Sequence, residues 1–462
     1  MPRAHTDKCG AGPRPALLPS PGLWLFAGVL LVYSICPPFI SYDSYWSVPT
    51  ALSIMRHGST AVDEFVPSAP VESRYALECV PAVGPPVPYG LANGCPGGHW
   101  YNFYPIGVPV LALPLVFLLK IKAAFWGPLL PKTGPLFAQP VVAAFFSGDF
   151  VAGHALVELW CASTFGAITV WLEYRIASRF LPRRQAVWLA LLFAFGTSEW
   201  SVASRNLYPH GLTVLLLSVA LYLALLARER PSRIRFAGLA LALACTVRPS
   251  NAISAAVFTL YVALHYRRHL ASFLLWTLPA AVPFFTYTLV VQHSLIPLYL
   301  RLPLERYPAL AGAAMHLFSP SRGLLIFTPV FLFSVAGMIL ACRLRWCWPL
   351  APYLVAIVVL HTALIVSIWP GHGYGPRYFT DITHLFILFL IPAILYWRTM
   401  RGPARTMAAG LFLLLAAWGV FAHGRGGTSI AANQWSALPV NVDQAKWRVW
   451  DWRDPQFLRG LR

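Results

Sequence analysis

The chain has 462 residues, of which 58% are hydrophobic and only 11% are charged, whereas soluble proteins carry about 25% charged residues. Apolar runs of about 20 residues recur from end to end, and this length spans a bilayer as a helix. The composition therefore predicts an all-α polytopic membrane protein. The net charge of +19 does not indicate nucleic-acid binding, because the arginines lie at the ends of apolar runs, where they set topology.

The order of the apolar runs predicts thirteen membrane spans, with the N-terminus inside and the C-terminus outside, because Lys and Arg clusters mark the inner side. The predicted spans are 22–41, 101–119, 136–152, 154–174, 186–204, 209–227, 236–250, 252–264, 270–291, 322–342, 348–368, 379–397 and 406–423. Span 136–152 and the pair 236–264 are short or interrupted, so eleven spans is the alternative. Losing two spans together leaves the sidedness of the other segments unchanged.

This topology divides the chain into a cytoplasmic tail (1–21), a transmembrane domain (22–423) and an external C-terminal tail (424–462). Two external segments, 42–100 and 292–321, lie within the transmembrane domain. Residues 51–57 of the first segment form a short amphipathic helix in this prediction, since Leu52 and Met55 share one face and basic residues turn towards the headgroups. Aromatic and basic residues alternate in the C-terminal tail, which predicts that it lies on the outer membrane surface or caps the cavity; the alternative is a simple interfacial anchor.

Cys79 and Cys95 are the two cysteines that this topology places in the first external segment. They could form a disulfide in an oxidising compartment. The alternative is two unpaired thiols. The other six cysteines fall in spans or on the inner side, and no pair has the spacing of a zinc site.

Asp43 follows the first span, where the chain leaves the lipid. A carboxylate held at the membrane surface beside an interfacial helix suits chemistry on a lipid-borne substrate, and the alternative is that it only ends a helix. Asp149 and Glu158 lie near an outer turn and could share a divalent cation with Asp43. No DxD, HExxH or paired Cys/His motif supports a metal, so no cofactor is predicted with certainty and a divalent cation stays open.

Four arginines oppose the orientation rule because they fall at or near the outer ends of spans: Arg205, Arg248, Arg322 and Arg377. A charge beside the hydrocarbon is costly and is usually retained for a partner. The phosphate of a lipid headgroup would be such a partner, since guanidinium binds it bidentately. The alternative is that each arginine pairs with a nearby acid or extends to the interface.

Aromatic and polar residues gather where the second span begins, at 99–107. His99 and Tyr104 could form part of a wall around a sugar, and His372, in the glycine-rich segment 371–377, could contact sugar or phosphate. The alternative is an ordinary aromatic belt at the membrane boundary.

Several segments together resemble the GT-C glycosyltransferases, polytopic enzymes that include protein O-mannosyltransferases and the lipid A aminoarabinose transferase. They are Asp43 after the first span, the helix 51–57 followed by Gly58, and YNFYPIGVPVL at 101–111. Arg248-Pro249, SPSRGLLIFTP at 319–329 and GYGPRYFTD at 373–381 resemble segments of bacterial members. The chain departs from the mannosyltransferases in two ways: their Asp-Glu pair is here Asp43-Ser44, and a large C-terminal soluble domain is not expected.

The resemblance implies an inverting glycosyltransferase that moves a sugar from a polyprenyl-phosphate donor to an acceptor hydroxyl at the outer face of a bacterial inner (plasma) membrane. It implies that Asp43 is the general base and that Arg377, Arg322, Arg248 and Arg205, in that order, contact the donor phosphate. The rival functions are a transporter or flippase of lipid-linked sugar, a polymerase or ligase of lipid-linked polysaccharide, and a non-catalytic assembly subunit. The sugar, the acceptor and the prenyl length are not determined by the sequence.

Overall fold

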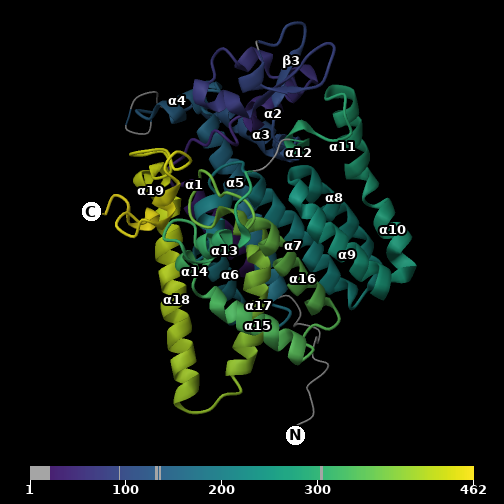
Figure 1. Cartoon of the computed structure of the whole chain (residues 1–462), viewed down its shortest axis with the longest axis vertical. Coiled ribbons are helices and arrows are strands. Elements are labelled where there is room, and N and C mark those ends of the chain that lie inside the picture. The colour runs from purple at the N-terminus through teal and green to yellow at the C-terminus, as the bar shows by residue number, and fades with distance from the viewer. Residues whose placement is uncertain (1–20, 93, 131–133, 135–136, 302–304, 462) are drawn as a thin grey trace.

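The computed structural model describes residues 21–92, 94–130, 134, 137–301 and 305–461. Apart from Pro21, the predicted cytoplasmic tail (1–21) and its Cys9 lie outside these residues. A bundle of helices fills the lower and middle part of the molecule, and a layer of loops, short helices and strands covers one end of it (Figure 1). Asp43 belongs to that layer, so we call this end of the bundle the Asp43 end.

The helices of the bundle agree in place with most of the predicted spans. They are α1 (Pro21–Ser34), α5 (His154–Ala177), α6 (Arg183–Phe195), α7 (Pro209–Ala227), α8 (Ala237–Val247), α9 (Ala252–His265), α10 (Leu270–Leu275), α11 (Leu278–Val291), α15 (Phe331–Arg343), α16 (Leu350–Ile365), α17 (Thr383–Trp397) and α18 (Pro403–Thr428). The interrupted pair 236–264 is present as α8 and α9. Shorter helices connect the rest: α12 (Leu298–Arg301), α13 (Ala309–Phe318), α14 (Leu324–Phe327) and α19 (Ile430–Gln434).

Six helices in the described part of the chain are long and apolar enough to cross a membrane. They are α3 (Gly107–Trp126), α5, α7, the nearly continuous segment Arg267–Val291, the segment Arg377–Trp397 that contains α17, and α18. Several other bundle helices are shorter, α1 having 14 residues. The total of thirteen spans therefore stays a prediction.

Two predicted spans differ from the structure. Segment 101–119 begins as a strand, and α3 starts only at Gly107. The ammonium group of Lys122 lies 3.7 Å from the centroid of the Trp160 ring, and Trp160 donates a hydrogen bond to the carbonyl of Ser34 at the Asp43 end of α1. Although α3 is long enough to cross, it therefore lies along the Asp43 end, and its lysines do not mark the opposite end as predicted.

The second difference is α4 (Pro140–Ser147), which replaces the predicted span 136–152 and has only eight residues. It packs against the first turns of α5, where the ring centroids of Phe145 and Trp160 are 4.8 Å apart. A helix needs about 20 residues to cross a bilayer, so α4 does not cross. The structure places the start of α5 at the Asp43 end, as the predicted topology requires, and the number of crossings stays a prediction.

The layer over the Asp43 end contains α2 (Ser47–His57), α3, α4 and a small antiparallel sheet. Its strands β1 (Leu77–Val80), β2 (Val87–Pro88) and β3 (His99–Asn102) are in the order β2-β1-β3. The predicted disulfide between Cys79 and Cys95 is present and ties β1 to the segment that leads into β3. The predicted amphipathic helix is confirmed as α2, whose left-handed C-cap is Gly58.

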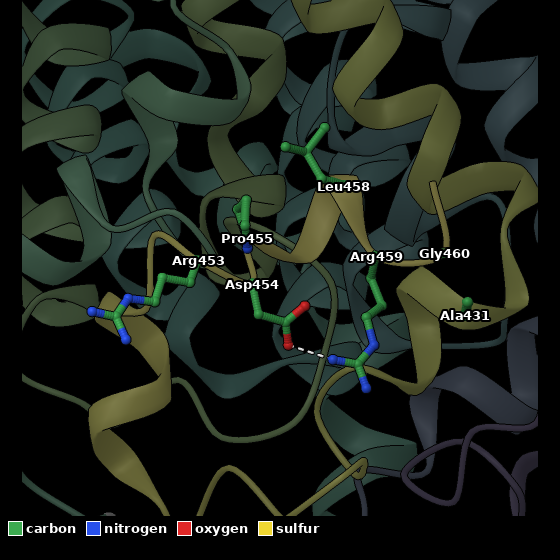
Figure 2. Close-up of a pocket in the computed structure, with 7 residues that line it drawn as sticks. All are labelled: Ala431, Arg453, Asp454, Pro455, Leu458, Arg459 and Gly460. Atoms are coloured by element: carbon green, nitrogen blue, oxygen red, sulfur yellow. Dashed lines mark hydrogen bonds and ion pairs between the residues drawn. The ribbon is translucent and has the colours of Figure 1, made fainter. Parts of the chain in front are cut away.

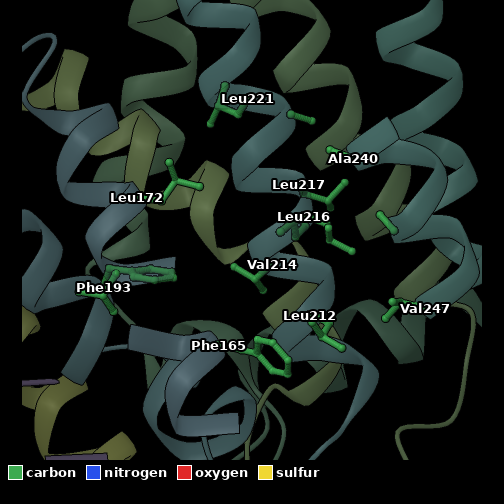
Figure 3. Packing of buried hydrophobic residues seen from close by; sticks show 14 of the residues in the cluster. Phe165, Leu172, Phe193, Leu212, Val214, Leu216, Leu217, Leu221, Ala240 and Val247 are labelled. Carbon is green, nitrogen blue, oxygen red and sulfur yellow. The ribbon is translucent and has the colours of Figure 1, made fainter. Parts of the chain in front are cut away.

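The core of the bundle lies between α5, α6, α7 and α8. Phe193 of α6 is fully buried, as are Leu221 of α7 and Ala244 of α8, and Figure 3 shows the side chains of these helices meeting in one cluster. Close packing of this kind makes an interior that resists deformation. The cluster therefore holds the start of α7 and the end of α8 in fixed positions at the Asp43 end.

Candidate active site

The turn that carries Asp43 lies between α1 and α2 and is tied to the bundle by its neighbour. The hydroxyl of Ser44 donates a hydrogen bond to the carboxylate of Glu158 on α5. The same carboxylate accepts the backbone N–H of Leu207, just before α7, at 3.1 Å. Glu158 thus joins three segments beneath Asp43, and its role in the structure is an anchor for the turn.

The carboxylate of Asp43 has partners from three further segments. Arg377 donates from Nη1 to Oδ2 at 2.8 Å. The hydroxyls of Tyr104 and Tyr75 both donate to Oδ1, Tyr104 at 3.1 Å. The Asp43 side chain is nevertheless 25% exposed and that of Arg377 is 11% exposed. The carboxylate is therefore held firmly and still open to a ligand.

These partners keep Asp43 ionised. Burial raises the pKa of Asp43, but the charge of Arg377 and the hydrogen bonds from Tyr75, Arg377 and Tyr104 together outweigh burial, so that the pKa lies below its ordinary value. Burial and then the charge of Asp43 raise the pKa of both tyrosines. At neutral pH the phenols are donors and Asp43 is a carboxylate.

A second ion pair lies beside the first. Arg248, which follows α8, places Nε 2.9 Å from Oδ2 of Asp381. His210, in the first turn of α7, places Nδ1 2.7 Å from Oδ1 of the same aspartate. The side chains of Asp381 and His210 are almost completely buried, whereas that of Arg248 is 17% exposed. The arginine is thus the member of this group that a ligand can reach.

One short 3₁₀ helix, η8 (Arg377–Ile382), joins the two ion pairs, since it supplies both Arg377 and Asp381. Between them in sequence, Tyr378 places its ring centroid 5.3 Å from the guanidinium carbon of Arg377 and 5.4 Å from that of Arg248. Two guanidinium groups therefore share one aromatic ring beside an exposed carboxylate. This arrangement can bind an anion next to a base.

The glycine-rich segment before η8 has a direct structural role in this site. Gly373 has φ +146°, and a Cβ added there would lie 2.9 Å from Cδ of Arg377. Gly375 has φ +54°, a conformation that side chains rarely adopt. Glycine therefore lets the chain pass close over the Arg377 side chain and fold back into η8.

Arg322 and Arg205, which the sequence also predicted as phosphate contacts, are committed to protein groups. Both are 1% exposed. Arg205 donates to the carbonyls of Tyr33 and Gly427 at 2.9 and 3.2 Å. Arg322 donates to two carbonyls, one amide oxygen and one hydroxyl, which belong to Ser321, Gly371, Gln456 and Ser436. These contacts indicate that both arginines link segments of the protein. Neither side chain is exposed to a ligand.

The three residues predicted to contact sugar or acceptor are found in different places. Tyr104 contacts Asp43 directly. His99 is 66% exposed on the sheet, with Nδ1 3.1 Å from Asp63. His372 lies 2.9 Å from Oδ1 of Asn441 in the C-terminal tail. Only Tyr104 of this set belongs to the site built around Asp43.

The structure also brings in residues that the sequence did not assign to the site. Asp381 and His210 carried a weak signal, since both are polar residues near the predicted outer ends of spans. Tyr378 stood inside GYGPRYFTD without a role of its own. Tyr75 had no signal, because it lies in a long loop 32 positions after the carboxylate that it contacts.

Of the other two predicted acids, Glu158 accepts a hydrogen bond from Ser44 beside Asp43, whereas Asp149 is used within a turn. Asp149 accepts the backbone N–H groups of Val151 and Ala152 in the turn before α5. Within the described ranges there is no group of three or more His, Cys, Asp or Glu residues that could hold a metal ion. A divalent cation therefore stays a prediction without a ligand cluster to support it.

A separate hollow lies in the C-terminal tail. Its volume is about 330 Å³, and it is lined by Ala431, Arg453, Asp454, Pro455, Leu458, Arg459 and Gly460. Figure 2 shows Arg459 turned towards Asp454, with which it forms an ion pair. None of its lining residues belongs to the Asp43 site, so we do not assign the active site to this hollow.

A protein family described as dolichyl-phosphate-mannose-protein mannosyltransferase matches residues 142–291. The match supports a GT-C glycosyltransferase. Together with six long apolar helices, it supports a multi-pass membrane protein. Neither curated proteins nor solved structures give a significant match.

The matched residues run from α4 to the end of α11 and cover about a third of the chain. They include His210 and Arg248 and the core formed by α5, α6, α7 and α8. They do not include Asp43, Arg377 or Asp381. The matched region thus covers the central part of the bundle, and the site itself is inferred from the geometry.

Proposed function

We propose that this protein is an inverting glycosyltransferase of the GT-C type, which moves a sugar from a polyprenyl-phosphate donor to an acceptor hydroxyl. The observation that carries the proposal is the arrangement of charge at the site. A carboxylate that is ionised and partly exposed lies beside two guanidinium groups, those of Arg377 and Arg248, which flank the ring of Tyr378. A carboxylate base next to two cations suits the transfer of a sugar from a donor whose leaving group is a phosphate.

The reaction follows from these groups. The acceptor hydroxyl loses its proton to Asp43 as its oxygen attacks the anomeric carbon from the face opposite the phosphate. The bond from that carbon to the phosphate oxygen breaks, and polyprenyl phosphate leaves with the electron pair. The guanidinium groups stabilise the negative charge that develops on the leaving phosphate. Within the described residues, Oδ2 of Asp43 accepts one hydrogen bond, from Arg377, so it retains a lone pair for the acceptor hydroxyl.

The sidedness of the site is part of the proposal. The end of the bundle opposite Asp43 carries Arg175, Arg179 and Arg398, together with other arginines of the predicted inner loops. By the positive-inside rule that end faces the cytoplasm. The disulfide Cys79–Cys95 lies in the layer over the Asp43 end, which agrees with an oxidising compartment. We therefore place the active site at the outer face, with residues 22–423 as the transmembrane domain and 424–462 as the external tail.

A transporter of lipid-linked sugar is the principal rival. A transporter needs access from both sides, and its site usually lies near the midplane between internal repeats. The Asp43 site instead lies at one end of the bundle, covered by the layer that contains α2 and the sheet. This placement favours the transferase.

The test measures sugar transfer from a set of radiolabelled polyprenyl-phosphate sugars by the purified protein in lipid nanodiscs. We expect Asp43→Asn to lower transfer by about 10²- to 10⁴-fold, the usual contribution of a general base, while donor binding persists. Asp63→Asn, which changes an aspartate in the short 3₁₀ helix Asp63–Phe65 beside the sheet, is the matched control and should transfer normally.

Equal transfer by wild type and Asp43→Asn would remove Asp43 from the mechanism. If no donor supports transfer but lipid-linked sugar crosses the bilayer of reconstituted vesicles, the protein is a transporter and the proposal is wrong.

A further inference from the structure

Arg248 is held by two different groups on two of its nitrogens. Asp381 lies 2.9 Å from Nε, and His210 places Nε2 3.3 Å from Nη1. His210 also places Nδ1 2.7 Å from Asp381. Because Nδ1 faces a carboxylate, it carries the proton of a neutral imidazole. Nη1 of Arg248 lies 3.3 Å from Nε2 and 3.5 Å from Nδ1 of His210, so the guanidinium packs against the imidazole ring. Asp381 therefore pairs with Arg248 and bonds to His210, and His210 supports Arg248 in turn.

These contacts leave one edge of the guanidinium open. In the described part of the structure Nε donates to the hydroxyl of Ser250 at 3.1 Å and forms the ion pair with Asp381, and Nη1 contacts His210. Tyr378 covers one face of the guanidinium. The nitrogen without such a partner is Nη2, on a side chain that is 17% exposed. A guanidinium fixed in this way can present only its Nη2 edge to a ligand.

We propose that Asp381 and His210 are positioning residues, which hold Arg248 so that its open edge receives the phosphate of the lipid-linked donor. The inference rests on the proposed function, because it names the part of the site that binds the donor. Arginine binds phosphate with a directional fork of donors, so the orientation of the fork matters as well as its charge. The buried side chains of Asp381 and His210 supply that orientation. The negative charge of Asp381 also reduces the positive charge that Arg248 presents to a phosphate.

The alternative is that Asp381 only neutralises a buried arginine, and the two roles predict opposite effects. Removing a mere counter-ion would leave Arg248 more positive towards a phosphate and would strengthen donor binding. Removing a positioning group frees the guanidinium to rotate and weakens binding. The sign of the change in affinity therefore distinguishes the two roles.

The experiment compares binding of a short-chain polyprenyl phosphate with that of the matching polyprenol in nanodiscs. We expect wild type to prefer the phosphate, and we expect Asp381→Asn to reduce this preference by about tenfold, which is about 1.4 kcal/mol. His210→Leu should do the same, although it changes no charge. Polyprenol binding should stay unchanged in both variants. A variant with a damaged fold would lose polyprenol binding as well. Asp454→Asn, which alters an Asp–Arg pair in the tail, is the matched control.

A double variant shows whether the effect passes through Arg248. In an Arg248→Ala background, Asp381→Asn should cause no further loss of phosphate preference, because residues that act through one group are not additive. A phosphate preference that is unchanged or increased in both Asp381→Asn and His210→Leu overturns the inference and leaves the transferase standing. A wild-type protein that shows neither phosphate preference nor transfer would instead overturn the proposed function.

Discussion

The Asp43 site and the junction of the C-terminal tail are built from similar parts and differ in what they can do. Each contains a guanidinium over an aromatic ring: Arg377 lies 5.3 Å from the centroid of Tyr378, and Arg322 lies 5.4 Å from that of Trp435. In the site the guanidinium meets a carboxylate that is itself partly exposed. In the tail junction it meets buried carbonyl, amide and hydroxyl oxygens of the protein.

The acceptors around each arginine, together with its exposure, therefore indicate its role, whereas its position at the outer end of a predicted span does not. Both terminal nitrogens of Arg322 donate hydrogen bonds to neutral acceptors. Arg322 therefore links the tail to the glycine-rich segment. A carboxylate partner on one nitrogen keeps Arg377 charged and localised beside Asp43. The following predictions test this comparison, from the largest expected effect to the smallest.

Replacing Arg377 should abolish most activity with a smaller effect on stability. Arg377→Gln removes a cation from beside the leaving phosphate and the ion-pair partner of Asp43, so we expect transfer to fall by about 10²- to 10³-fold, as when an electrostatic donor is removed from other active sites. Initial rates at saturating donor, measured beside thermal unfolding, give both quantities. A variant that unfolds easily but transfers normally when folded would reverse the roles assigned to Arg377 and Arg322.

Replacing Arg322 should have the opposite signature. Arg322→Gln leaves several buried acceptors without donors, each costing about 1–3 kcal/mol, so we expect the free energy of unfolding to fall by about 3 kcal/mol or more. Detachment of the tail should appear as faster proteolysis after residue 430. The rate of transfer per folded molecule should change less than in Arg377→Gln, and a comparable loss would make Arg322 part of the site.

Replacing Tyr104 tests the support of the base. Tyr104→Phe removes a hydrogen bond that helps to lower the pKa of Asp43, so the pKa should rise and the acid limb of the profile of kcat/KM against pH should move to higher pH. The loss of a hydrogen bond to a charged group is worth about 1.5–3 kcal/mol, so we expect transfer at neutral pH to fall about tenfold. Tyr101→Phe, on β3, is the matched control and should leave the acid limb in place.

The smallest effect on transfer is expected from Glu78, a buried acid that lacks an arginine contact. Burial raises the pKa of Glu78 to about 8, against smaller opposing effects of a hydrogen bond from Gln292 and the charge of Arg301. Because the folded pKa lies above the ordinary value, the stabilisation is complete below the ordinary pKa and is lost as pH rises through about 8. Wild type should lose thermal stability as pH rises from about 5 to about 8, and Glu78→Gln should remove this dependence. Identical pH profiles for the two proteins would show that Glu78 is ionised in the folded state.

The sequence predicted much of the scaffold. Long apolar runs separated by arginine clusters indicated the helices α5, α7, α17 and α18, because a helix in lipid must satisfy its backbone internally and needs a minimum apolar length. The same runs predicted spans at α3, which lies along the Asp43 end, and at α4, which has only eight residues. An apolar helix can also bury its side chains at one end of a bundle, so hydropathy alone does not show which helices cross.

For the candidate site, the types of residue and their approximate positions could be predicted from the sequence: Asp43 after the first span, Tyr104 at the start of the second predicted span, and four arginines at or near the outer ends of spans. It also indicated the pair Cys79 and Cys95. Only the tertiary structure decided which arginines face a carboxylate, because Arg377 and Asp43 lie 334 positions apart. It likewise brought Tyr75, His210 and Asp381 into the site. Hydrogen bonds and ion pairs act over a few ångströms and have no periodicity along the chain, so their partners are set by how the helices pack.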